Sequence, residues 1–168
     1  FHSCFNFVPE RYGKVAPVLL DELRRRGFGI GVHGLVHDEK LFACRRIFEK
    51  RAPLINHYLK EWHATGFHSP AMFHNLEWIA ELNVEYDCST FDTDPFEPQP
   101  DGVRTIFPFL VHRNSVVPKA SKPSSFLASE PERRYVELPY TLPQDHCLFV
   151  ILKEKDIRIW KEKLDWIA

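Results

Sequence analysis

Histidines are the residues of this 168-residue chain whose type and spacing point most directly to chemistry. His33 and His37 are four residues apart, and they directly follow a predicted strand at 27–32. On a helical turn such a pair lies on one face, so that both imidazoles can reach one cation. Zinc takes imidazole nitrogens at about 2.0–2.1 Å, commonly with a carboxylate as a further ligand. The pair indicates a divalent-metal site, and the alternative is that both histidines are ordinary loop residues.

A second candidate segment is the loop Gly66–Ala71, which contains His68. Pro70 removes one donor from this loop and stiffens it, which leaves the backbone N–H of Ala71 free to face a ligand. The alternative is a turn that only joins two elements of structure.

Acidic and aromatic residues provide two more candidates. Asp87 lies beside Tyr86 within a predicted strand at 84–89, where a simple turn-forming role does not explain a carboxylate. A carboxylate there could bind a metal or orient a catalytic histidine. The segment Glu137–His146 either lines a cleft with Tyr140 or is a rigid turn.

Strand and helix patterns alternate through the first ninety residues. The patterns predict strands at 5–8, 27–32, 67 and 84–89, and helices at 15–26, 41–65 and 76–82. Glycines in the 27–32 strand would let a neighbouring backbone approach closely. Pro17 fits only the first turn of its helix, Gly66 is expected to cap the second, and Asn75 the third. This alternation predicts an α/β fold with a mostly parallel sheet, whose functional residues collect at the carboxyl edge of the strands.

The second half of the chain is richer in proline and less regular. Strand-like segments lie at 104–111 and 135–138, and the polar stretch 112–134 is expected to be a long loop. A last helix is predicted from Ile157, Trp160, Leu164 and Ile167, with Asp156 as its cap.

Composition narrows the classes of function. With 22 Lys and Arg against 23 Asp and Glu, the net charge of −1 argues against a nucleic-acid-binding surface. The hydrophobic share of 44% is enough for a packed core. Four scattered cysteines without a C-x-x-C pair argue against a thiolate zinc site or a disulfide framework, and they favour a cytoplasmic location. The apolar run Cys147–Leu152 is far shorter than the ~20 residues of a membrane span.

Taken in order, these segments resemble the polysaccharide deacetylase family (carbohydrate esterase family four, with the NodB homology domain). His33–Asp38 matches the H-x-x-x-H motif of the family, and Gly66–Pro70 is similar to its R-x-P motif. Tyr86–Ser89 is similar to the fourth motif, which lies beside the catalytic groove, and Phe5–Val8 to the second strand.

The resemblance implies a distorted, incomplete (β/α) barrel over residues 1–168. It implies a hydrolase of non-peptide amide bonds that removes acetyl groups from a saccharide, with zinc or another divalent ion held by His33 and His37. By the same resemblance, the Ala71 N–H would be an oxyanion donor and Asp87 would lie in the groove and orient the acid. The expected substrate-contacting residues are His68, Pro70, Tyr86 and Tyr140.

The chain departs from the family pattern in three places. The T-F-D-D motif, which supplies the base and a third metal ligand, is absent and would precede Phe1. The L-x-x-H motif, which supplies the acid, is absent and would follow Ala168. His68 stands where the family carries an arginine, and imidazole cannot replace a bidentate guanidinium. We therefore expect a domain trimmed at both ends and inactive by itself. The alternative is a catalytically inactive, glycan-binding member.

Overall fold

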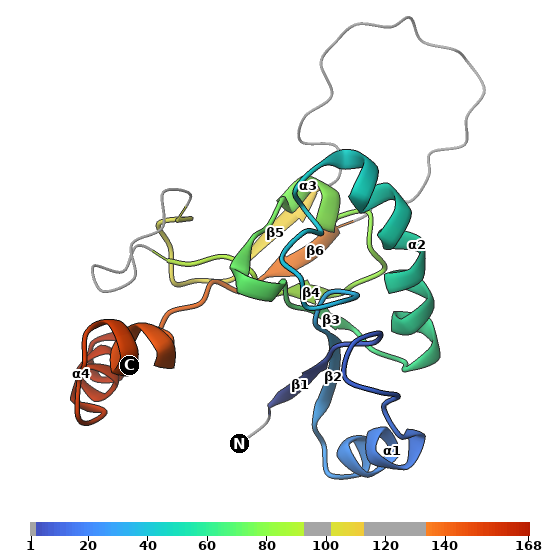
Figure 1. The fold of residues 1–168 in the computed structure, drawn as a ribbon. Helices are drawn as coiled ribbons and strands as arrows, with labels where there is room; N and C mark the ends of the chain where they lie inside the picture. The colour runs from blue at the N-terminus through green and yellow to red at the C-terminus, as the bar shows by residue number, and fades with distance from the viewer. Residues whose placement is uncertain (1–2, 93–101, 113–133) are drawn as a thin grey trace, which may run out of the picture. The chain divides into compact units, whose positions relative to one another are not determined.

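The computed structural model describes residues 3–92, 102–112 and 134–168 of the chain. The chain divides into two compact units. The first comprises Phe1–Ser89 and Phe109–Glu137, and the second comprises Thr90–Pro108 and Leu138–Ala168. The first unit contains a six-stranded, mostly parallel sheet with helices between its strands (Figure 1), so the predicted α/β class is confirmed.

The sheet has the strand order β1-β2-β3-β4-β6-β5. Its strands are β1 (Cys4–Phe7), β2 (Gly29–Val32), β3 (Gly66–Phe67), β4 (Tyr86–Asp87), β5 (Phe109–His112) and β6 (Arg134–Glu137). Neighbouring strands pair in parallel, except that β5 and β6 are antiparallel. Because parallel strands end at the same edge of a sheet, the segments that follow β2, β3, β4 and β6 meet at one edge.

Helices follow the first three strands of the first unit. They are α1 (Pro17–Arg25), α2 (Arg45–Glu61), the 3-10 helix η1 (Pro70–Met72) and α3 (Leu76–Ile79). Pro17 starts α1, and the side chain of Asn75 caps α3 by accepting from the N–H of Trp78 at 3.1 Å; both agree with the sequence predictions. The prediction that α2 starts at 41 is wrong, because Leu41 is buried in the core as part of a turn that precedes the helix.

One face of α2 supplies much of the core of the first unit. Its buried residues recur at helical spacing and are Phe48, Ala52, Ile55 and Leu59. Pro53 lies inside the helix on its exposed side, where its missing N–H costs least. Ile30 and Val32 of β2 and Phe67 of β3 belong to the same core. The alternation of β2 thus sends its branched side chains to the helix-covered face and its glycines to the other.

Gly66 lies inside β3, so the prediction that it caps α2 is wrong; α2 ends at Glu61. The register places Gly31 and Gly66 side by side in one row across the sheet, between Asn6 and Tyr86. A Cβ atom on Gly66 would lie 2.6 Å from Cε2 of Tyr86, and one on Gly31 would overlap Oδ1 of Asn6. These glycines therefore make room mainly for two side chains that fold across the sheet, and less for a neighbouring backbone.

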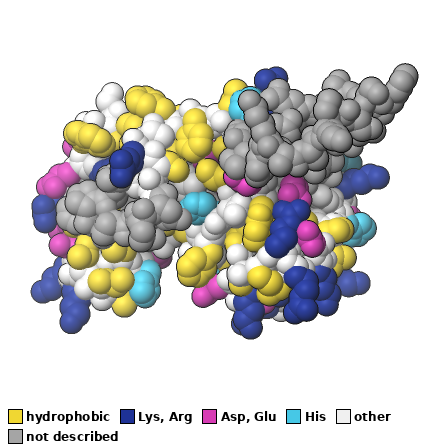
Figure 2. Space-filling model, turned by 90° about the horizontal axis from the view of Figure 1, so that it is seen from above, with side chains coloured by type: hydrophobic (Ala, Val, Ile, Leu, Met, Phe, Trp, Pro, Cys, Tyr) yellow, Lys and Arg dark blue, Asp and Glu magenta, His cyan; other side chains and the backbone are white. Residues whose placement is uncertain are grey.

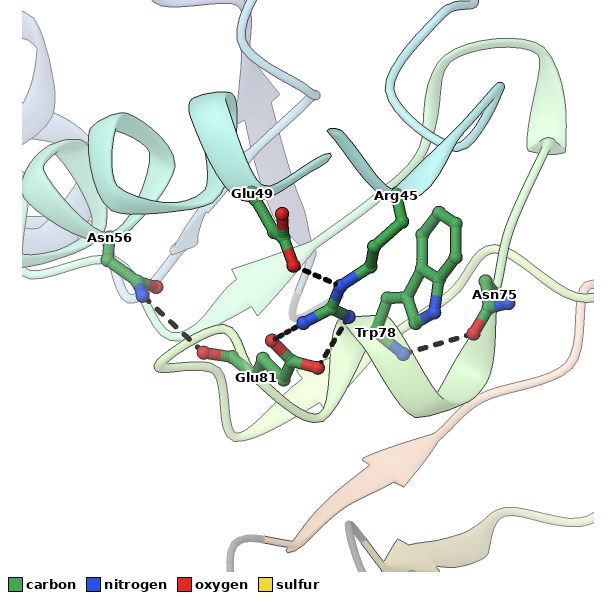
Figure 3. Close-up of polar contacts among 6 residues, drawn as sticks. All are labelled: Arg45, Glu49, Asn56, Asn75, Trp78 and Glu81. Atoms are coloured by element: carbon green, nitrogen blue, oxygen red, sulfur yellow. Dashed lines mark hydrogen bonds and ion pairs between the residues drawn. The ribbon is translucent and has the colours of Figure 1, made fainter. Parts of the chain in front are cut away.

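Arg45 ties the start of α2 to the segment that follows α3 (Figure 3). Its Nη1 and Nη2 donate to the two carboxylate oxygens of Glu81 at 2.7 and 2.8 Å, and its Nε donates to Glu49 at 2.9 Å. The guanidinium carbon also lies 5.4 Å from the ring centre of Phe48 and 5.5 Å from that of Trp78. A planar guanidinium can make all of these contacts at once, whereas a lysine ammonium could not.

The second unit contains the π-helix η2 (His146–Ile151) and α4 (Arg158–Ile167). The indole N–H of Trp160 donates to the carbonyl oxygen of Pro143 at 2.7 Å. Lys163 and Asp92 form a buried ion pair at 3.1 Å, with side chains only 12% and 4% exposed. These two contacts attach α4 to the rest of the second unit.

Two sequence predictions concern this half of the chain. Asp156, the expected cap of the last helix, accepts from the N–H of Arg158 at 2.9 Å, although the N-cap residue of α4 is Ile157. The long loop expected at 112–134 lies, apart from its two end residues, outside the described residues. Within the described ranges, no helix combines the length and the apolar character needed to cross a membrane. On the face shown in Figure 2, basic and acidic side chains are interspersed with hydrophobic ones.

Candidate functional site

The strand ends bring the predicted site residues to one edge of the sheet. His33 directly follows β2, His68 directly follows β3, and Asp87 is the last residue of β4. Glu137 is the last residue of β6, which pairs with β4. Because these four strands are parallel, all four residues lie at the edge where the sequence predicts the site.

Three imidazole rings lie against one another at this edge. The ring centroids of His33 and His37 are 5.0 Å apart, and those of His33 and His68 are 4.9 Å apart with 13° between the ring planes. The segment between His33 and His37 consists of bends and not of the helical turn that the spacing suggests, yet the rings still meet. In the described part of the chain, no group of three or more His, Cys, Asp or Glu side chains is placed to hold a metal ion. His33 and His37 could together supply two metal ligands, which is fewer than a complete site needs.

Hydrogen bonds determine which nitrogen of each ring is available. The Nδ1–H of His33 donates to the backbone oxygen of His68 at 2.9 Å, and the Nδ1–H of His68 donates to that of Cys88 at 2.7 Å. A carbonyl oxygen can only accept, so the neutral form of each ring keeps its lone pair on Nε2. Metal-binding histidines commonly donate their other N–H to a carbonyl in this way. The His33 ring thus has its lone pair on Nε2, through which it could bind a metal.

Burial keeps the His33 and His68 rings neutral. Burial, and then the neighbouring His68 and His37 rings, lowers the pKa of His33 to about 4. Burial also lowers the pKa of His68. Because only the neutral imidazole coordinates a metal, His33 at pH 7 needs to lose no proton on binding.

The loop that carries His37 is anchored by two arginines. Arg51 of α2 makes a bidentate ion pair with Asp38, with both N···O distances at 2.7 Å. Arg11 donates to the backbone oxygen of His37 at 2.5 Å. These contacts hold the chain at His37 and at the residue that follows it, which limits the positions that the His37 ring can take.

The two loops of the site touch at Gly34 and Pro70. Gly34 has a φ of +65°, and a Cβ atom there would lie 2.8 Å from Cγ of Pro70, so only glycine fits. Ala71 and Met72 also have positive φ angles, +54° and +60°. Left-handed backbone costs a residue other than glycine about 1–2 kcal/mol, and such strain is concentrated at functional sites. Ala71 is exposed, and its role as an oxyanion donor stays a prediction.

Substituting Asp38 by asparagine is expected to weaken the anchor of this loop in a pH-dependent way. Hydrogen bonds from Arg51 lower the pKa of Asp38 from 3.8 to about 2. The ion pair therefore stabilises the fold fully above about pH 4, and this contribution is lost as the pH falls through 2. Because the pair is partly exposed and screened, we expect Asp38→Asn to lower the free energy of unfolding by only about 1 kcal/mol at pH 7.

Urea denaturation at several pH values measures the difference in free energy of unfolding between the wild type and Asp38→Asn. It should shrink as the pH falls towards 2, where about half of the wild-type carboxyl is protonated, and should approach zero below that. Asp21→Asn is the matched control, because Asp21 is 76% exposed in an i,i+3 pair with Arg24 and should matter little. A loss for Asp38→Asn that stays constant down to pH 2 would contradict the ion-pair explanation.

The other predicted site residues lie in different environments. Asp87 is completely buried, with 0% exposure, so it does not line an open groove. Tyr86 does not join the histidines: it lies over Gly66, and its hydroxyl donates to Sγ of Cys4 at 2.7 Å. Tyr140 belongs to the second unit, where it forms a β-bridge with Phe91. The structure thus brings together His33, His37, His68 and Pro70.

Sequence reasoning included three polar residues of this edge in its candidate segments but gave none of them a role. Glu137 is 0% exposed, and burial together with the charge of Glu137 raises the pKa of Asp87 well above its usual value. Ser89 and Ser69 are 0% and 1% exposed and are hydrogen-bonded to each other. The alternation in Arg134–Glu137 would have revealed Glu137, because Tyr135 points into the core and Glu137, two residues later, lies on the same face.

No protein-family model matches the chain, and no match was found among curated proteins.

Proposed function

We propose that this chain belongs to a metal-dependent hydrolase of the polysaccharide deacetylase type, which removes acetyl groups from a saccharide. We propose also that its sheet is part of a distorted, incomplete (β/α) barrel. The observation that carries the proposal is the His33–His37 pair, with rings 5.0 Å apart at the end of β2. The resemblance of the other two motifs and of the second strand, in the same order along the chain, also supports it.

The donor set fits a divalent metal in part. His33 offers Nε2 and His37 offers its ring as two of the ligands that zinc takes, and the proposal requires a carboxylate from the T-F-D-D motif, which these 168 residues lack, as a third. When bound, such a metal supplies Lewis acidity towards the acyl oxygen and lowers the pKa of a water molecule. His68 holds His33 in position through its backbone oxygen, and Pro70 packs against Gly34. Ala71, in its left-handed conformation, presents the N–H that we assign to the developing oxyanion.

A second candidate function is binding of a glycan without cleavage. The observation that favours it is His68, which stands where the family has arginine. Its ring is stacked on His33 and its Nδ1–H is used by Cys88, so it provides no second donor for a bidentate contact. With its pKa lowered by burial, it also provides no fixed positive charge at pH 7.

Titration of the chain with zinc alone tests the metal site. We expect the 168-residue chain to bind zinc weakly in calorimetry, because two imidazoles are an incomplete ligand set. His33→Ala and His37→Ala should each reduce the affinity by more than the ~10–100-fold that loss of an outer hydrogen-bond partner costs. His57→Ala is the matched control, because His57 is 66% exposed on α2 and should leave zinc binding unchanged.

Release of acetate from N-acetylglucosamine oligomers tests the reaction. We expect none from the 168-residue chain, and zinc-dependent release from a longer chain that also carries the T-F-D-D and L-x-x-H motifs. Zinc and glycan binding by that longer chain without acetate release would favour the glycan-binding function. Equal turnover by the metal-stripped longer chain would overturn the proposed function.

A further inference from the structure

A groove lies along α2, beside the stripe of residues that faces the core. Its volume is about 670 Å³, which is within the range of roughly 300–1,000 Å³ that ligand sites have. The loop after β2 also lines the groove, with Leu35 and Val36. The α2 residues that line it recur at helical spacing, and they are Arg46, Ile47, Lys50, Arg51 and Leu54. This helix therefore presents a second surface besides the one that is buried in the core.

Apolar side chains line the groove at two separate places on α2. Ile47 is half-buried and Leu54 is 42% exposed. They are seven residues apart, which is about 10 Å along a helix axis at a rise of about 1.5 Å per residue. Val36, also half-buried, adds apolar surface from the loop after β2. A ligand that contacts both ends of this surface must therefore be extended, with apolar groups about 10 Å apart.

Two basic side chains of the groove have no acidic partner. Arg46 and Lys50 are exposed and four residues apart on α2, and neither forms an ion pair with a residue that the structure describes. All other arginines of α1 and α2 form ion pairs; they are Arg24, Arg25, Arg45 and Arg51. Two like charges four residues apart destabilise a helix. The stability of α2 therefore does not explain why both residues are basic, whereas an anionic partner would.

The remaining charges of the groove leave it positive. Arg51 is neutralised by its bidentate ion pair with Asp38. Glu10 is the one acidic residue among the described residues that line the groove. Two basic side chains, Arg46 and Lys50, therefore stand against one acidic side chain. Because complementary charge gives an interface its specificity, a positive and partly apolar groove selects a ligand that is both anionic and apolar.

We propose that this groove binds an acidic, amphipathic segment of a partner protein. The aliphatic side chains of the segment contact Ile47 and Leu54, and its carboxylates pair with Arg46 and Lys50, which lie one helical turn apart. A small anion would reach only one part of this surface, and a flat lipid surface would touch only the exposed rim of a groove. A peptide segment spans the distance and presents both kinds of side chain. This binding needs neither metal nor saccharide, so it does not depend on the proposed function.

Selection from a displayed library of random peptides of about 12 residues, long enough to span the groove, tests the surface. We expect the wild-type chain to enrich peptides that combine Asp or Glu with aliphatic residues, and the double variant Arg46→Glu/Lys50→Glu to lose this enrichment. Enrichment that is absent, that lacks acidic residues or that is equal in both chains would overturn the proposal. Vesicles of phosphatidylserine are tested in parallel, and we expect no binding to them. Binding to these vesicles that the double variant loses would assign the surface to lipid instead.

Fluorescence anisotropy with the most enriched peptide, labelled with a dye, measures the affinity. We expect Arg46→Glu and Leu54→Ala each to weaken binding by about tenfold, because one reverses a paired charge and the other removes an apolar contact. Lys60→Glu is the matched control, because Lys60 is exposed on the same helix and does not line the groove, so the affinity should not change. Equal affinity of the wild type and Arg46→Glu would overturn the proposed charge pairing.

Urea denaturation separates loss of binding from loss of folding. Arg46→Glu places a glutamate four residues before Lys50, an arrangement that stabilises a helix, so its unfolding midpoint should equal or exceed that of the wild type. A stable variant that no longer binds the peptide would show that Arg46 serves the partner and not the fold. Because these measurements need neither zinc nor acetate release, the proposed function can fail while they succeed, and the reverse.

Discussion

Replacing Gly66 by alanine is expected to destabilise the first unit by about 3 kcal/mol. The new Cβ atom would lie 2.6 Å from Cε2 of Tyr86, and closer still to Cζ and the hydroxyl. The aromatic ring is rigid and its hydroxyl is bonded to Cys4 on β1, so it cannot move aside without losing that contact. Urea denaturation should show a lower midpoint with an unchanged slope.

Two variants make the Gly66 result specific. Gly29→Ala is the matched control, because a Cβ atom there would meet nothing closer than 3.4 Å, and we expect a cost well below that of Gly66→Ala. In Tyr86→Leu the clash partner is removed, so adding Gly66→Ala to that variant should cost less than it does in the wild type. If the two costs are equal, the tyrosine ring is not the reason for glycine at 66.

Replacing Phe48 by alanine is expected to cost about 3–5 kcal/mol. Phe48 is 0% exposed on α2, with its ring 5.8 Å from that of Phe42 and 5.5 Å from that of Trp78. The loss combines the transfer of a large side chain out of the core with a cavity that these rings cannot fill. The shift of the urea midpoint measures it.

The control for this variant uses the same chemical change at the surface. Phe73 is 57% exposed in the same unit, so Phe73→Ala should cost less than about 1 kcal/mol. Similar losses in the two variants would mean that the core is not organised around α2.

Local chemistry made much of the fold predictable. Pro17 marks a helix start because it has no N–H to leave unpaired, and Asn75 marks one because its side chain accepts from the N–H of Trp78 in the first turn. The alternation of strands and helices predicted the parallel sheet, and the parallel sheet placed His33, His68 and Asp87 at one edge. In each case the signal lies within a few residues of the element that it specifies.

Long-range contacts made the rest unpredictable. Gly66 resembles a helix cap, and only the position of Tyr86 on the next strand explains why it lies in β3. Glu137 becomes a site residue because β6 pairs with β4, and β5 intervenes in sequence between them. The bend at His33–His37 likewise depends on Arg51, which reaches Asp38 from α2. No local sequence pattern shows which distant residue a given residue will contact in the folded chain.

The pairing of β4 with β6 also has a kinetic consequence. β6 reaches β4 only after the chain has closed a long loop, and closing such loops is the slow part of forming non-local sheets. We therefore expect β1, β2 and β3 to associate before β6 joins. Glu137 would then come to lie beside Asp87, and the loop after β3 would become fixed in position, in one of the last steps of folding. The site would be assembled when the chain completes its sheet.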